Sequence, residues 1–393
     1  ALAVTLVIQA MVAMALLTLP VMAPVAAKDL AVSPALVGVY VALTYAGAMF
    51  ASLSAGTTVS RLGPIRVSQW GLVLCATGLC LCAVPWLPAI GLGALLIGLG
   101  YGPITPASSQ ILARTTPPAQ MALVFSIKQT GVPVGAMLAG AIVPSLMLRI
   151  DWQWSLVAVA TACVLSALLS QPMREAMDDL RQANLPFQMG TLTTPLRMVL
   201  GHRALTTMAA CSFMFSMVQM SLTTYLVTYL HDDLAYGMVS AGLLLSVTQI
   251  GGIGGRIAWG VVADRWMGAQ KTLAMLASLM AMSALATALL LPVLPIWGIW
   301  AILLVFGASA IGWNGVYLAE VARQAPEGKA SVATGGTLTF TFLGVVIGPP
   351  LFGALSSAFG TYRAGFLAFR ANAGSRSDTT IPSTNGMAMI IKM

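Results

Sequence analysis

Long stretches without any charged residue constrain this chain more than any other feature. Nine such runs make up most of the sequence: residues 1–27, 30–60, 67–113, 129–148, 152–173, 204–230, 234–255, 272–319 and 330–362. A helix needs about 20 apolar residues to cross a bilayer, so each run can hold a spanning helix. Only 8% of the 393 residues are charged, against roughly 25% in a soluble domain. The chain is therefore predicted to be an all-α, polytopic membrane protein.

Two of the runs, 67–113 and 272–319, are long enough for two spans each. A pair of prolines interrupts each of them near its middle, at positions 85 and 88 and at positions 292 and 295. Counting both runs twice gives eleven clear spans. A twelfth is expected to begin near Thr361, but Arg370 interrupts it, and residues 371–393 have the composition of a polar tail outside the fold. The first span is interpreted as lacking its leading residues.

Positive charge divides unevenly between the two sides of the predicted membrane. One alternating set of loops contains eleven Lys and Arg, whereas the other contains only Lys28, Arg149 and Arg363. Because Lys and Arg concentrate in cytoplasmic loops, we expect a multi-pass protein of the cell inner membrane with its central loop in the cytoplasm. The net charge of +8 then requires no nucleic-acid partner.

The spans group into two halves of six. Residues 172–203 are the longest polar stretch, which predicts a bundle over 1–171, a cytoplasmic linker over 172–203, a second bundle over 204–370 and a tail over 371–393. The halves also repeat each other, because the two double runs begin just after Arg66 and Lys271, 205 residues apart. Parallel repeats with paired Gly- or Pro-interrupted helices are typical of secondary transporters.

The loop after the eighth span carries the most specific motif, Gly-x-x-x-Asp-Arg-x-x-Gly-x-x-Lys at 260–271. This motif resembles the loop signature of the major facilitator superfamily, and a degenerate copy with Ser60 in place of the acid lies between spans 2 and 3. The resemblance covers residues 1–369 and implies two six-helix bundles that give alternating access to a central cavity. It is nearest to monocarboxylate and organic-anion porters, which carry an arginine where this chain has Arg256.

Two cations interrupt the spans and need a functional explanation. Lys128 lies inside span 5 and Arg256 near the inner end of span 8, and intramembrane charges normally face a cavity or a partner. Lys128 could instead snorkel to the interface, and Arg256 could instead pair with gate acids. A guanidinium suits bidentate carboxylate recognition, so two buried cations predict an anionic ligand. The remaining candidate substrate-binding residues are polar groups within spans: Gln129, Gln219, Tyr225, Gln249 and Asn314.

The acidic residues lie near helix ends, and the family resemblance implies that they form a charge cluster that closes the cytoplasmic side. Asp264 and Glu320 have Arg265 and Arg323 close by in sequence. The alternative is that these are solvated loop charges. In the first half Ser60 and Thr115 stand at the corresponding positions, which predicts a weaker or uncharged latch there. The full set of predicted gating residues is Arg61, Arg66, Gly260, Asp264, Arg265, Gly268 and Glu320.

The predicted function is therefore secondary active transport of a small, carboxylate-like organic anion, with or without a coupling proton, by a monomer in the lipid bilayer. A drug-efflux antiporter is the alternative, because Gly-Val-Pro-Val-Gly at 131–135 partly matches a span-5 motif of such carriers. A transport-inactive sensor or scaffold is the other. We find no enzyme motif, and neither a cofactor nor a metal is expected; the five cysteines are interpreted as apolar filler.

Overall fold

The computed structural model describes residues 1–32, 37–179, 181–182, 193–236, 238–291 and 293–374. These residues form helices and connecting turns, without strands in the described ranges. The first half contains α1 (Leu2–Asp29), α2 (Val37–Leu62), α3 (Pro64–Cys82), α4 (Leu87–Tyr101), α5 (Ile104–Thr115), α6 (Met121–Gln129) and α7 (Gly131–Leu169). The second half contains α10 (Arg203–Thr228), α11 (Met238–Val262), α12 (Ala269–Leu289), α13 (Ile296–Ala310), α14 (Asn314–Gln324), α15 (Ala330–Phe359) and α16 (Tyr362–Gly374).

Ten described helical segments are long and apolar enough to cross a membrane. The predicted eighth span is helical as well, since α11 has 25 residues. Both predicted proline interruptions are confirmed as helix boundaries: α4 begins at Leu87 with proline in its first turn, and Pro295 is the N-cap of α13. Proline suits a helix start because its missing N–H would have no partner there. The prediction of an all-α polytopic fold is confirmed.

The twelfth helix, α16, has 13 residues and is not among the ten segments long enough to cross a membrane. Arg370 does not interrupt it, because α16 continues through that position to Gly374. Phe366 of this helix is fully buried in the second half and packs against Phe352, with 5.0 Å between the ring centroids. Residues 375–393 of the predicted tail lie outside the described residues.

The predicted linker contains short helices. η3 (Gln171–Met173) and α8 (Arg174–Met177) follow the first half, and α9 (Thr193–Gly201) precedes α10. α8 packs on α3, whereas α9 packs along α15. The linker therefore contributes helices to the surfaces of both halves.

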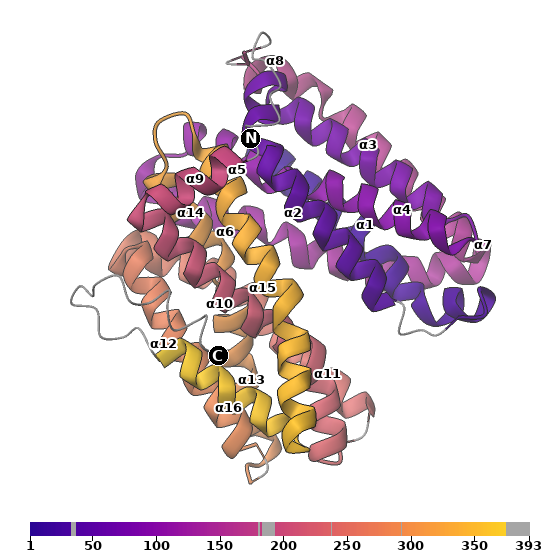
Figure 1. Cartoon of the computed structure of the whole chain (residues 1–393), viewed down its shortest axis with the longest axis vertical. Coiled ribbons are helices and arrows are strands. Elements are labelled where there is room, and N and C mark those ends of the chain that lie inside the picture. Colours follow the sequence, from indigo (N-terminus) through magenta and orange to yellow (C-terminus); the bar gives the residue numbers. More distant parts are fainter. Residues whose placement is uncertain (33–36, 180, 183–192, 237, 292, 375–393) are drawn as a thin grey trace.

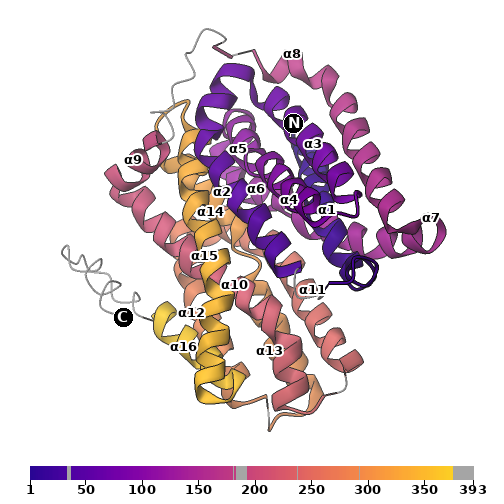
Figure 2. The ribbon, with the colours of Figure 1, turned by 45° about the vertical axis from the view of Figure 1, so that its right-hand side comes forward.

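The two halves meet at one end and diverge at the other. We call the end that carries α8, α9 and the loops after α2 and α11 the linker end, and the opposite end the far end. Figures 1 and 2 show the helices of the two halves in contact near α5, α6 and α14 and spreading apart toward the far end. Across the boundary, α2 packs on α15, and α6 packs on α11 and α14.

Candidate functional site

Lys128 is enclosed by polar oxygen atoms of the first half, on the helix α6 that packs against the second half. Its side chain is 1% exposed. The ammonium Nζ donates to Gln9 Oε1 at 2.7 Å, to Gln129 Oε1 at 3.0 Å and to Thr105 Oγ1 at 3.4 Å. All three acceptors are neutral, and no carboxylate of the described residues pairs with this lysine. In this structure Lys128 is therefore buried and does not snorkel to the membrane interface.

Arg256 lies at the ends of two helices from opposite halves. Its guanidinium is 3% exposed; Nε donates to the carbonyl of Ile311 at 3.1 Å, and Nη1 donates to the carbonyl of Gln129. Gln129 is the last residue of α6, and Ile311 is the C-cap of α13. Because the C-terminal end of a helix carries partial negative charge, both ends favour a cation. Arg256 makes no ion pair with gate acids in the described part of the chain.

These contacts extend into a connected polar network in the second half. Asn314 Nδ2 donates to the same Ile311 carbonyl at 3.5 Å and to Gln219 Oε1 at 3.3 Å, and Trp313 Nε1 donates to that Gln219 oxygen at 3.0 Å. We call the whole set the central polar chain; it consists of Gln9, Thr105, Lys128, Gln129, Gln219, Arg256, Ile311, Trp313 and Asn314. It joins helices of both halves.

Interruptions of the helical hydrogen-bond pattern supply part of this network. They lie between α4 and α5 at 102–103, between α6 and α7 at Thr130, and between α13 and α14 at 311–313, although the backbone keeps right-handed helical angles there. Two carbonyls at these places, from Gln129 and Ile311, accept hydrogen bonds from Arg256.

Two predicted substrate-binding residues lie outside the central polar chain. Gln249 is half-buried and makes no hydrogen bond with the described residues. Tyr225 stacks on Phe352 at 4.9 Å between ring centroids and lies 5.9 Å from the Tyr362 ring, so it packs inside the second half. The physical reason is helical periodicity: Tyr225 follows Gln219 by six residues, which turns it about 240° around the helix axis.

At the linker end Asp264 joins the halves. It belongs to the π-helix η6 (Ala263–Met267), and its carboxylate accepts backbone N–H bonds from Ala122 at 3.1 Å and Leu123 at 2.7 Å. These N–H groups lie in the first turn of α6, where a helix has no internal acceptors for them and where negative charge is favoured. Asp264 of the second half therefore caps a helix of the first half.

Arg323 strengthens this contact. Its Nη2 donates to Asp264 Oδ1 at 3.1 Å and to the carbonyl of Pro118 at 2.7 Å. Glu320 lies 3.8 Å from the same guanidinium and accepts from two glutamine side chains, Gln270 and Gln324, at 2.8 Å each. We call Asp264, Glu320 and Arg323 the charged latch.

Other predicted gating residues take different positions. Arg265 is exposed without an ion pair to the described residues, so Arg323 is the cation of the charged latch. Arg61 is half-buried, and Arg66 contributes its backbone N–H and a bond from Nη1 to Gln69 at 3.3 Å. The direction in which a side chain points from a turn depends on the geometry of the loop. Residue spacing alone does not predict that geometry.

Two of the predicted glycines have different physical roles. Gly260 lies where the two halves approach each other closely, since a Cβ there would lie 2.8 Å from Ser126 Oγ and 2.9 Å from Leu123 Cα of the other half. Gly268 has φ +77°, a left-handed turn conformation that favours glycine, and Gly63 has φ +91° at the corresponding place in the first half. The loop repeat predicted from the sequence thus ends in the same kind of turn in both halves.

A neutral amide of the first half also joins the two halves at the linker end. Gln110 Nε2 donates to the carbonyl of Gly328 at 3.1 Å, and Gln110 Oε1 accepts the N–H of Ser331 in the first turn of α15 at 3.2 Å. Gln110 therefore caps a helix of the second half, as Asp264 caps one of the first. This contact adds an uncharged link beside the charged latch.

Asp178 of the linker makes a contact with α3 that the sequence did not predict. Its carboxylate accepts the N–H groups of Ile65 at 2.8 Å and Arg66 at 3.1 Å in the first turn of α3. Burial raises the pKa of Asp178, while the two N–H bonds and Arg174 act in the opposite direction. Because more than 100 residues separate these partners, no local sequence pattern predicts their contact.

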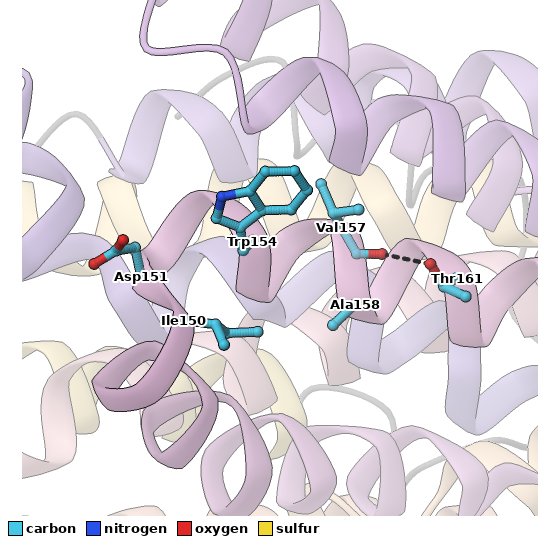
Figure 3. A pocket seen from close by; sticks show the side chains of 6 residues that line it. All are labelled: Ile150, Asp151, Trp154, Val157, Ala158 and Thr161. Carbon is cyan, nitrogen blue, oxygen red and sulfur yellow. Dashed lines mark hydrogen bonds between the residues drawn. The ribbon is translucent and has the colours of Figure 1, made fainter.

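Figure 3 shows a separate hollow on the surface of α7. It has a volume of about 420 Å³ and is lined by Ile150, Asp151, Trp154, Val157, Ala158 and Thr161. It lies where α7 bends, because Ile150 and Asp151 leave helical geometry there. Residues of one helix alone line it, and it includes none of the central polar chain.

The sequence as a whole matches the family model for the Major Facilitator Superfamily over residues 4–349. The chain belongs to the major facilitator superfamily. Among MFS relatives, an uncharacterized MFS-type transporter of Mycobacterium tuberculosis is 27% identical over 68% of this chain and 58% of that protein. The hexuronate transporter of Bacillus subtilis is 24% identical over 56% of each chain. The chain thus spans less than two thirds of the length of these relatives.

Solved structures support the same MFS fold. The human organic anion transporter MFSD10 is similar with a TM-score of 0.76 and 15% identity, over 95% of this chain and 96% of that one. At this identity the likeness shows the fold alone. The family and the ten candidate spans make the chain a multi-pass membrane protein.

Proposed function

We propose that this transporter carries a small organic anion with a carboxylate group, and that Lys128 and Arg256 bind its charge. The observation that supports this most strongly is that two cations, 1% and 3% exposed, have only neutral oxygen partners among the described residues. A buried charge without an opposite charge is costly even when it is hydrogen-bonded. An anionic ligand would remove that cost and gain affinity from it.

The charge of the central polar chain also argues against an exporter of cations. Within the described spans no Asp, Glu or His belongs to the central polar chain, and cationic substrates need a buried acid as counter-charge. The polar groups around Asn314 and Gln219 would then contact hydroxyl groups of the substrate. A hexuronate is one anion with both features, and the Bacillus relative is named for hexuronate transport.

Transport is proposed to occur by alternating access between the two halves, with the linker end facing the cytoplasm. The charged latch and the Gln110 contact hold the linker end closed in this state. Opening it requires those contacts to break, and the far end would then close. The positive loops at the linker end support this orientation in the inner membrane.

Uptake into proteoliposomes tests the proposal. The panel consists of labelled acetate, lactate, gluconate, glucuronate and inorganic phosphate, with the variants Lys128→Gln and Arg256→Gln. We expect the parent to transport at least one carboxylate and both variants to lose that transport, since each removes a buried charge. Lys28→Gln and Arg149→Gln are matched controls, because both cations are exposed, and they should retain transport.

Unchanged uptake in both buried variants would refute the anion assignment. Membrane insertion and elution as a single species must be the same for all four variants, so that a loss of uptake reports on binding. A parent that transports none of the five anions would also contradict the proposal.

A further inference from the structure

Gln9 in α1 has an unsatisfied donor inside the central polar chain. Its side chain is fully buried, and its oxygen Oε1 accepts hydrogen bonds from Lys128 Nζ at 2.7 Å and from Thr105 Oγ1 at 3.1 Å. Its amide nitrogen Nε2 has no partner among the described residues. A buried N–H group without an acceptor is unfavourable, and native structures rarely leave one without a ligand or water.

The orientation of this amide is determined by its neighbours. An ammonium group can only donate, so the side of the amide that faces Lys128 must be the oxygen. Rotating the amide by half a turn would place its own N–H groups against Lys128 and lose that bond. The donor side therefore has to be the side without a protein partner.

We infer that Gln9 is an anion-binding residue, whose Nε2 donates to the carboxylate that Lys128 attracts. This inference rests on the proposed function, because the ligand is the same anion. The two nitrogen donors are close neighbours, because Lys128 Nζ donates to the oxygen of the same amide that carries Nε2. An ordered water would satisfy the amide but would leave the charge of Lys128 uncompensated, whereas a carboxylate does both.

Gln9 therefore also excludes competing ligands. A neutral or cationic solute brings no negative charge to the ammonium, and an apolar one leaves the Nε2 donors without an acceptor. Among anions, a planar carboxylate can place one oxygen near each nitrogen. Inorganic phosphate shares the charge but not the planar shape, so it serves as the comparison ligand.

Two substitutions at Gln9 test this inference by ligand-induced thermal stabilisation of the purified full chain. Gln9→Leu removes the donor, and we expect the dissociation constant for glucuronate to rise about tenfold or more, the usual effect of losing a hydrogen bond to a charged group. Gln9→Glu places a carboxylate beside Lys128 and should abolish the response to glucuronate while raising the melting temperature of the ligand-free protein.

The control is a buried glutamine whose donors are already paired. Gln69 Nε2 donates to the Ala167 carbonyl at 3.1 Å and to Gln171 Oε1 at 2.8 Å, away from the central polar chain. Gln69→Leu should lower the melting temperature and leave the dissociation constant for glucuronate unchanged. This separates general damage to the fold from loss of a ligand contact.

A double variant separates direct contact from positioning of Lys128. If Gln9 only held Lys128 in place, adding Gln9→Leu to Lys128→Gln would have no further effect on binding of acetate, lactate, gluconate, glucuronate or phosphate at high concentration. We expect a further loss for the carboxylates and a smaller one for phosphate.

Equal binding by the parent and Gln9→Leu, or a full glucuronate response in Gln9→Glu, would overturn the role of Gln9. If Lys128→Gln and Arg256→Gln lose transport while both Gln9 variants bind as the parent does, this inference fails and the proposed function stands. If the parent responds to none of the five anions, both fail together.

Discussion

Replacing Gly315 by alanine should force the linker end open. A Cβ at this position would lie 2.2 Å from both Cα and Oγ of Ser126, which belongs to α6 of the other half. Ser126 is fully buried, and its Cα is backbone, so it cannot move aside as a flexible side chain would. The halves must separate for alanine to fit.

The size of the effect follows from this contact. Carbon atoms pack at about 3.5–4.0 Å, so the closed state requires a separation of more than about 1 Å at this point. Overpacking of this kind typically costs about 1–3 kcal/mol. Since the open state would release the clash, the closed population should fall by roughly 5- to 150-fold relative to the open one.

Distances between spin labels measure this shift. Labels on Thr115 and Lys329, which are exposed on opposite halves at the linker end, report its opening after the native cysteines have been replaced. We expect Gly315→Ala to populate a longer distance than the parent. Gly254→Ala is the matched control, because a Cβ on Gly254 meets nothing within 4 Å. A distance distribution of Gly315→Ala identical to that of the control would refute the reasoning.

Three further predictions concern charge and hydrogen bonding. Asp264→Asn removes the partner of Arg323 and weakens the cap of α6, so the same spin labels should report more opening, by about 1.5–3 kcal/mol; an unchanged distribution contradicts this. Burial raises the pKa of Asp178 above its ordinary value of 3.8, so its contribution to stability is largest below that pH and is lost as pH rises through the folded-state pKa. Asp178→Asn should flatten the melting temperature over that window, and a retained slope would assign it to another group. Gln219→Leu removes the acceptor of Trp313 Nε1 and leaves Asn314 only the Ile311 carbonyl, so it should weaken glucuronate binding more than lactate binding, whereas equal weakening would place Gln219 away from the substrate hydroxyls.

The charge-free runs predict the spans well because a bilayer tolerates few charges, and the described parts of these runs are mostly helical. Charge alone does not predict the interruptions at 102–103, Thr130 and 311–313, because no charged residue marks them. Glycine and proline do lie at these places, namely Gly102, Pro103, Pro133 and Gly312. The partner of the exposed carbonyls, Arg256, comes from tertiary packing, which the local sequence does not predict.

For the site, charge was again the informative signal. Lys128 and Arg256 stand out because intramembrane cations are rare, and the structure brings both to Gln129. Uncharged residues carried less information: Tyr225 is polar and lies in the expected helix, but it packs on Phe352 and not in the central polar chain. Asp178 pairs with residues far away in the sequence, and only an alignment or a structure reveals such contacts.

Because Lys128 and Arg256 have no opposite charge beside them among the described residues, the membrane potential acts on both. A charge that crosses a membrane potential of 100 mV changes energy by about 2.3 kcal/mol. Lys128 and Arg256 lie where the halves meet, so any movement of them along the membrane normal during reorientation would be voltage-dependent in the empty carrier. A bound monoanion would cancel half of that charge and a dianion all of it. Membrane potential would thus favour one orientation of the empty protein and discriminate between ligands of different valence.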